Sequence, residues 1–243
     1  MSAHLALHDL TLGYDRHPAV HHLDGRIEDG ALLAIIGPNG GGKSTLLKGI
    51  AGRIAPLGGR IENSFPRLAY MPQIGDLTRD FPVNVMDLAL TGLCGKSGMF
   101  GRIGKQDRQR AHEAINAVGL TGFEARPIRT LSGGQMQRLL FARLMVQDAP
   151  LLLLDEPFSA IDSGTIADLL AIIARWHKEG RTILIVLHDL EIVRQHMPQS
   201  LLIAREPIAW GASSAVLNQP NLDRARAMSE AFDRDAAECR RAA

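Results

Sequence analysis

A glycine-rich segment, Gly37–Thr45, constrains the fold of this chain more than any other part of its sequence. It reads Gly-Pro-Asn-Gly-Gly-Gly-Lys-Ser-Thr and lies between a short apolar run, Leu32–Ile36, and a predicted helix, Lys43–Ala51. Glycine permits the backbone conformations in which successive N–H groups turn toward one anion, and the start of the helix adds its positive dipole end. A strand, a glycine loop and a helix in this order predict the phosphate-binding loop of an α/β domain.

The residues of this loop have distinct expected roles. The backbone is expected to surround the phosphates of a nucleotide along the whole motif, which comprises Gly37, Pro38, Asn39, Gly40, Gly41, Gly42, Lys43, Ser44 and Thr45. The Lys43 ammonium is expected to reach the β- and γ-phosphates, and the Ser44 hydroxyl is a hard oxygen ligand suited to Mg²⁺. The expected ligands are therefore ATP and Mg²⁺.

Two carboxylates follow a second buried run, Leu151–Leu154. Open α/β sheets bind ligands at the carboxyl ends of their strands, which is where Asp155 and Glu156 are expected to lie. Asp155 suits the Mg²⁺ site, and Glu156 can polarise or deprotonate an attacking water. A third run, Thr182–Leu187, ends at His188, which is therefore expected at the same edge, either to hydrogen-bond the γ-phosphate or to hold the water near Glu156.

Charge and apolar-run length exclude other classes. The chain has 243 residues, with 27 Lys and Arg against 26 Asp and Glu, so its formal net charge is +1. This near-neutral balance argues against a protein that coats nucleic acid. The longest apolar runs are far shorter than the roughly 20 residues that cross a bilayer, so we expect no membrane-spanning segment. These runs are Ala31–Ile36, Leu151–Leu154 and Ile183–Leu187.

The hydrophobic pattern of the other segments predicts an antiparallel sheet and several helices in addition to the parallel sheet. Alternating segments near the start predict an antiparallel sheet made of Ala6–Leu12, Val20–Ile27, Ile61–Asn63 and Leu68–Met71. Between Gln73 and Thr130 the pattern becomes helical. Further helices are expected around Thr165–His177 and Asp189–Gln195, and in a surface tail from Asn221.

A second candidate anion site lies at Leu131–Gln135, which reads Leu-Ser-Gly-Gly-Gln. Ser132 is expected to cap an amphipathic helix over Met136–Val146, and a helix N-terminus attracts phosphate. Two such termini suggest two surfaces that meet around one nucleotide, although spacing alone does not bring them together.

Taken together, these motifs resemble those of the ATP-binding subunit of ABC transporters. The resemblance extends from Leu5 to about Leu217 and rests on the order of six motifs: Gly37–Thr45, Gln73, Leu131–Gln135, Leu151–Glu156, Ser159–Asp162 and His188. It implies a P-loop, RecA-like α/β core with a mostly parallel sheet, an N-terminal antiparallel β subdomain and an inserted helical subdomain. The implied organisation is one domain over 1–243, with its core in 1–73 and 145–217, the insertion at about 74–144 and a helical tail over 221–243.

The resemblance also assigns roles that spacing does not. Two subunits are implied to form a head-to-tail homodimer, in which Ser132, Gly133, Gly134 and Gln135 of one subunit cover the ATP held by the other. Gln73 is implied to contact Mg²⁺ and the attacking water, so the implied catalytic residues are Glu156, His188, Gln73 and Lys43, and the implied Mg²⁺ ligands are Ser44, Gln73 and Asp155. Tyr14 matches an aromatic that stacks on adenine, with a partly buried strand-end tyrosine as the alternative. The segment Ser159–Asp162, with Ile161 where leucine is commoner, is implied to couple the two ATP sites.

A single nucleotide-binding subunit without a span resembles the importer arrangement, in which separate permease subunits carry the transport path. The stretch from Phe81 to Arg102 is similar to zinc and manganese uptake ATPases, while iron-siderophore, haem and cobalamin importers have similar subunits. The permease is implied to contact the 74–104 region, where Phe81, Met86, Met99 and Phe100 either line its groove or fill the subdomain core. The chain is then expected at the cytoplasmic face of the inner membrane, held by the permease, with a solute-binding protein acting indirectly and no nucleic acid as partner.

Two alternatives stay open. Five of the nine histidines fall within the first 22 residues, and His17, His21 and His22 could converge on Zn²⁺, although neither cysteine nor fixed spacing supports this.

A soluble ABC ATPase is the other functional class. Translation factors carry two such domains and repair ATPases carry long coiled coils, which this sequence lacks, so a cofactor-assembly ATPase is the form that remains.

Overall fold

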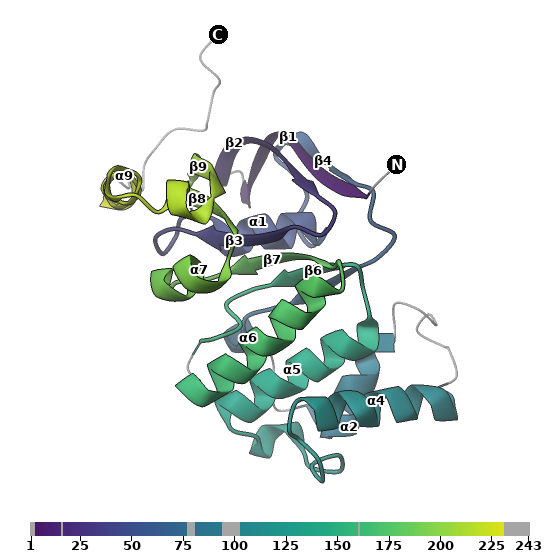
Figure 1. Cartoon of the computed structure of the whole chain (residues 1–243). Helices are drawn as coiled ribbons and strands as arrows, with labels where there is room; N and C mark the ends of the chain where they lie inside the picture. Colours follow the sequence, from purple (N-terminus) through teal and green to yellow (C-terminus); the bar gives the residue numbers. More distant parts are fainter. Residues whose placement is uncertain (1–2, 16, 77–80, 94–102, 160, 231–243) are drawn as a thin grey trace. The chain divides into compact units, whose positions relative to one another are not determined.

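The computed structural model describes residues 3–15, 17–76, 81–93, 103–159 and 161–230. The chain divides into two compact units (Figure 1). The first comprises Met1–Leu68, Pro150–Asp155 and Gly180–Ala243, and the second comprises Ala69–Ala149 and Glu156–Glu179. The second unit thus contains the predicted helical insertion and also 156–179, whereas the organisation as one functional domain stays a prediction.

The first unit contains a mostly parallel sheet, in which five strands follow the order β6-β7-β3-β8-β9. Every residue of β3 (Leu32–Ile36), β6 (Leu151–Leu154) and β7 (Thr182–Val186) is buried, as expected of parallel strands covered on both faces. The four strands β6, β7, β3 and β8 (Gln199–Ala204) are parallel, and β9 (Glu206–Ala212) is antiparallel to β8. The predicted runs at β3 and β6 are confirmed to the residue, and β7 ends one residue earlier than expected.

A three-stranded antiparallel sheet of the same unit has the order β2-β1-β4. It contains β1 (His4–Tyr14), β2 (His17–Glu28) and β4 (Gly58–Asn63), so the predicted antiparallel subdomain is confirmed in these strands. The prediction that Leu68–Met71 belongs to this sheet is wrong. That segment, β5, is not one of the three strands of this sheet, and it lies where the chain passes from the first unit to the second.

Helix α1 (Lys43–Ile50) contacts β1 and β2 as well as β7, so it packs against both sheets. Gly49 permits this close approach, because a Cβ there would lie 2.5 Å from a methyl carbon of Leu12 on β1. The other helices of the unit are α7 (Leu190–His196), α8 (Ser213–Val216) and α9 (Gln219–Glu230). The predicted tail helix begins two residues before Asn221, and 231–243 lie outside the described residues.

The second unit is helical. It contains η1 (Ile74–Asp76), α2 (Val85–Leu90), η2 (Thr91–Leu93), α4 (Lys105–Ala117), η3 (Ile128–Thr130), α5 (Gly133–Gln147) and α6 (Ser163–Lys178). Helix α5 packs against α2, α4 and α6, and Figure 1 shows α4, α5 and α6 side by side. Phe141 of α5 stacks on Trp176 of α6 with ring centroids 5.6 Å apart, and both rings are buried. Burial of large aromatic surface fixes these two helices against each other.

Among the described residues, every helix is too short or too polar to cross a membrane.

Candidate nucleotide-binding and hydrolysis site

The glycine loop connects the buried strand β3 to helix α1 at the carboxyl edge of the sheet. Gly42 caps the helix with a φ of +91°, and a Cβ there would lie 2.3 Å from the Ala19 carbonyl oxygen. Both the positive φ and the close approach restrict this position to glycine. The loop is held in place by two backbone bonds, because Gly41 N–H donates to Pro38 O at 3.1 Å and Arg205 N–H donates to Gly41 O at 3.0 Å. The loop is thus a fixed backbone cradle at a helix N-terminus, suited to a phosphate group.

Lys43 lies at the first turn of α1 and is only 5% exposed. Its Nζ donates to two carbonyl oxygens of the loop, Gly37 O at 2.9 Å and Pro38 O at 2.8 Å. The ammonium is therefore held inside the loop, where a nucleotide phosphate is expected to compete for it.

Ser44 and Asp155 meet across the first unit, although they are 111 residues apart in the sequence. The Ser44 hydroxyl donates to Asp155 Oδ1 at 2.8 Å, and Asp155 is 1% exposed at the end of β6. A hydroxyl and a carboxylate are the hard oxygen ligands that Mg²⁺ prefers, so this pair fits the predicted magnesium site.

Glu156 follows directly and belongs to the second unit, where it meets Gln73 and Ser159. Gln73 Nε2 and the Ser159 hydroxyl both donate to Glu156 Oε2, at 2.8 Å and 3.1 Å. Glu156 has a φ of +48°, a left-handed conformation that is unfavourable for a residue with a side chain. Such strain is concentrated at functional sites. The pairing of Gln73 with Glu156 agrees with their predicted joint role, whereas the Ser159 contact was not predicted from the sequence.

The other two residues predicted near the nucleotide lie at strand ends. His188 is exposed after β7, at the same edge of the parallel sheet as Asp155. Tyr14 ends β1 and is 49% exposed, which leaves its ring accessible for stacking. Their contacts with ATP stay predictions. The same holds for three residues of the glycine loop: Asn39 and Gly40 are exposed, and Thr45 is buried on α1.

A cavity of about 390 Å³ adjoins the loop in the first unit. It is lined by Pro38–Gly41, by Ala204 and Arg205, and by Met228 of α9. This volume is within the range of small-molecule sites.

The segment Ser132–Gln135 forms the start of α5. Gln135 N–H donates to Ser132 Oγ at 3.2 Å, and Ser132 N–H donates to Gln135 Oε1 at 3.0 Å. This reciprocal cap confirms Ser132 as the N-cap residue, and the helix begins at Gly133 rather than at Met136. Ser132 is exposed, so the N-terminus of α5 is accessible to a partner.

The residues proposed to face a permease differ in exposure. Phe81 is 66% exposed, whereas Met86 is 8% exposed and lies in the core of the second unit. For Met86 the core alternative therefore holds. Met99, Phe100 and Arg102 lie outside the described residues.

Three of the N-terminal histidines lie beside carboxylates. His22 Nδ1 lies 2.7 Å from Asp9 Oδ1, and His4 and His8 each lie 3.4 Å from an oxygen of Glu62. His21 is partly buried, and this burial lowers the pKa of its ring. Within the part of the chain that the structure describes, groups of three or more histidine, cysteine or acidic residues in a metal-binding arrangement are absent.

The glycine loop, the buried Lys43 and the Ser44–Asp155 pair at the carboxyl edge of a parallel sheet define a P-loop nucleotide-binding ATPase. A family model described as ABC transporter matches residues 20–159, which is more than half of the chain. The chain belongs to the ABC transporter family, and it is an ATP-binding subunit of that family, an ATPase coupled to transport.

Individual relatives agree with this assignment. The zinc transport system ATP-binding protein TroB of Treponema pallidum (strain Nichols) is 40% identical over 224 residues, covering 89% of this chain and 84% of that protein. The manganese transport system ATP-binding protein MntB of Bacillus subtilis (strain 168) is 34% identical over 225 residues, covering 90% of each. Among solved structures, a metal-chelate type ABC transporter in an inward-facing conformation matches with a TM-score of 0.83 and 28% identity, covering 93% of this chain and 89% of that one.

Proposed function

We propose that this chain hydrolyses ATP to power the import of zinc or manganese ions. The observation that carries the choice of cargo is the 40% identity to a zinc transport ATP-binding protein across 89% of the chain. The 34% identity to a manganese transport ATP-binding protein supports a divalent metal ion without separating the two.

In this proposal the first unit binds the phosphates. The loop amides and the N-terminus of α1 receive the β- and γ-phosphates, and the Lys43 ammonium exchanges its two carbonyl partners for phosphate oxygens. Ser44 and Asp155 hold Mg²⁺, which when bound neutralises phosphate charge. Gln73 as a further Mg²⁺ ligand belongs to the same proposal.

Glu156 is the proposed general base. It takes a proton from a water molecule as that water attacks the γ-phosphorus, the bond to the ADP oxygen breaks, and inorganic phosphate leaves. Gln73 already donates to Oε2 of this carboxylate, so it can hold the water and the base in one orientation. His188 is proposed to contact the γ-phosphate from the strand edge.

A homodimer completes the proposed site. Ser132–Gln135 offer a second capped helix N-terminus that is accessible on α5, and this terminus is proposed to cover the γ-phosphate held by the other subunit. Closure then depends on ATP, and hydrolysis reopens the pair. The chain is proposed to work at the cytoplasmic face of the cell membrane, on permease subunits that contact the 74–104 region, with a solute-binding protein delivering the ion.

Transport by the complete complex tests the cargo. The chain is reconstituted with its permease in vesicles, and ATP-dependent uptake of radiolabelled zinc, manganese and a ferric siderophore is compared. The Glu156→Gln complex is the matched control for uptake without turnover. Uptake of zinc or manganese supports the proposal, whereas uptake of the ferric siderophore alone assigns the chain to an iron importer.

A further inference from the structure

Arg138 lies on α5, one turn beyond the capped terminus Ser132–Gln135, and its guanidinium joins three elements of the second unit. Nη1 donates to Val118 O at 3.1 Å, at the C-terminal end of α4. Nη2 donates to Asp168 Oδ2 at 2.7 Å and to Thr165 Oγ1 at 3.3 Å, both on α6. A planar guanidinium can serve three acceptors on two helices at once, which a lysine ammonium on a flexible stem does less well.

Thr165 links Arg138 to Asp162 through hydrogen bonds. Its hydroxyl accepts from Arg138 and donates to Asp162 Oδ2 at 2.8 Å, while its backbone N–H donates to Asp162 Oδ1 at 2.9 Å. Thr165 is 6% exposed, so this hydroxyl is shielded from water. Both oxygens of the Asp162 carboxylate are therefore anchored at the start of α6.

The terminus of α5 approaches the same pair of residues independently. A Cβ built on Gly134 would lie 3.6 Å from Thr165 Oγ1 and 3.8 Å from Asp162 Oδ2. Gly134 is one of the residues proposed to face the partner's ATP, and Asp162 ends the segment that the family resemblance assigns to coupling between the sites. The two candidate contact surfaces thus lie side by side within one unit.

We propose that the chain of hydrogen bonds from Arg138 through Thr165 to Asp162 is a positioning device. It holds the capped N-terminus of α5 and the N-terminal end of α6 at Asp162 as one rigid surface for the partner subunit. We call Arg138, Thr165, Asp162 and Asp168 the α5–α6 bridge. The inference rests on the proposed ATP-dependent homodimer. Two surfaces that are already held together lose less conformational entropy when the dimer closes, so the bridge strengthens closure without touching the nucleotide.

The matched pair Thr165→Val and Thr165→Ser tests the bridge. Valine keeps the shape and the methyl group but removes the hydroxyl that links Arg138 to Asp162, whereas serine keeps the hydroxyl and removes only the methyl. Both are introduced into the Glu156→Gln chain, in which slow hydrolysis is expected to preserve the ATP-bound dimer. The dimer dissociation constant with ATP is measured by sedimentation, and ATP binding to the isolated chain is measured in parallel.

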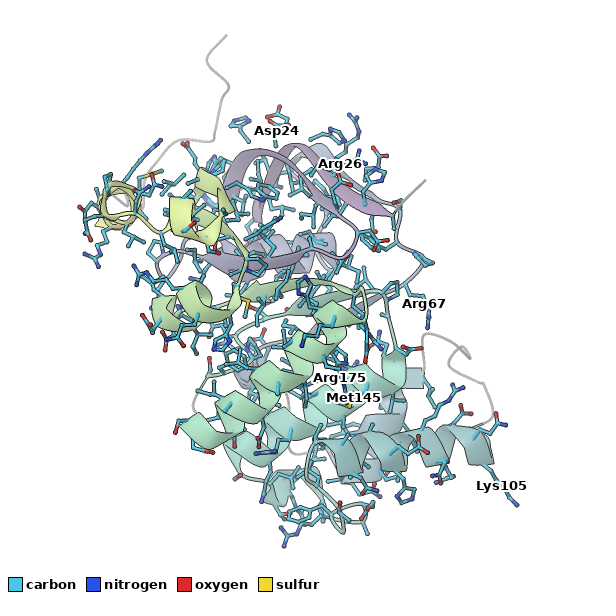
Figure 2. The ribbon with its side chains drawn as sticks, in the orientation of Figure 1. Asp24, Arg26, Arg67, Lys105, Met145 and Arg175 are labelled. Atoms are coloured by element: carbon cyan, nitrogen blue, oxygen red, sulfur yellow. The ribbon has the colours of Figure 1, made fainter. Side chains whose placement is uncertain are left out.

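We expect Thr165→Val to weaken the ATP-dependent dimer about tenfold and Thr165→Ser to weaken it less than about threefold, with ATP binding by the isolated chain unchanged in both. Arg138→Lys is the second variant, and it is expected to fall between them because one ammonium replaces only part of the guanidinium contacts. Arg175→Gln is the control. Figure 2 labels Arg175 on α6, where its Nε lies 3.6 Å from Glu179 Oε1 in an exposed pair beyond the bridge. Its removal is expected to leave the dimer unchanged.

The outcomes distinguish failure of the α5–α6 bridge from failure of the proposed ATP-dependent homodimer. A Glu156→Gln chain that binds ATP and stays monomeric contradicts the proposed dimer and the bridge together. Equal dimer affinity for Thr165→Val and Thr165→Ser contradicts the bridge alone, as does an Arg138→Lys dimer as strong as that of the parent chain. A merely structural role would lower the unfolding temperature of these variants without changing dimer affinity well below that temperature.

Discussion

Gln73 Nε2 donates a hydrogen bond of 2.8 Å to Glu156 Oε2; Gln73 lies two residues beyond the end of β5, and Glu156 lies two residues beyond the end of β6. The bond orients the side chain of Glu156, the proposed base. A carboxylate is needed for proton transfer, whereas an amide keeps the shape and loses the basicity.

Glu156→Gln is therefore expected to lower the rate of ATP hydrolysis at least about 100-fold while changing the ATP dissociation constant less than about twofold. Phosphate release and fluorescent-nucleotide titration measure the two quantities. Glu179→Gln, at the exposed end of α6, is the control for the same chemical change and is expected to hydrolyse ATP normally. Near-normal hydrolysis by Glu156→Gln would rule out its role as base.

Lys43→Met is expected to weaken ATP binding about 10- to 100-fold, because the bound phosphates lose a charge-assisted hydrogen bond from a group that is 5% exposed. The same change also frees the Gly37 and Pro38 carbonyl oxygens that Lys43 now holds. Titration with a fluorescent ATP analogue measures the effect. Lys48→Met removes a lysine from the same helix away from the loop, and equal losses in the two variants would argue against a specific role for Lys43.

The sequence predicted those parts of the candidate site that depend on residues close together along the chain. The ends of β3 and β6 follow from apolar runs that stop at the glycine loop and at Asp155, and the structure confirms both strand ends. Pairing between distant segments was harder to predict. Nothing local indicates that Leu68–Met71 leaves the antiparallel sheet, because strand pairing is decided by tertiary packing rather than by propensity.

Other features lacked a recognisable local signal. The hairpin of β8 and β9 was not predicted. It turns at Arg205 with a φ of +64°, a left-handed backbone conformation that is uncommon for residues other than glycine, so the sequence does not mark a turn there. The three contacts of Arg138 were missed as well, because its acceptors lie 20, 27 and 30 residues away in the sequence. Basic residues on a helix usually face solvent, so only the tertiary structure distinguishes this one.

Gly42→Ala is expected to destabilise the chain by about 3 kcal/mol or more, since a Cβ would lie 2.3 Å from a backbone carbonyl oxygen and φ is +91°. Gly40→Ala is the matched control. It has a φ of +75° but open space within 4 Å of a Cβ, so only the backbone conformation is penalised, at about 1 kcal/mol. Urea unfolding followed by circular dichroism measures both. Equal losses would show that the contact with Ala19 contributes nothing beyond the positive φ.

Asp162→Asn is expected to reduce the loss of stability at low pH. The Thr165 backbone N–H, and after it the Thr165 hydroxyl, lower the pKa of the Asp162 carboxyl below its ordinary value of 3.8. A lowered pKa means that the folded chain binds the proton less tightly than the unfolded chain does. The stabilisation is therefore complete above the ordinary value and is lost as the pH falls through the lowered pKa. Asparagine retains an oxygen that caps α6 but does not titrate, so the variant keeps the cap at every pH.

The free energy of unfolding at about pH 6 and about pH 3 measures the difference. The wild-type chain should lose more stability between these conditions than Asp162→Asn, and Thr165→Val, which removes the hydroxyl partner, should lose an intermediate amount. Identical losses in all three chains would show that the anchored carboxylate at the start of α6 is not linked to folding.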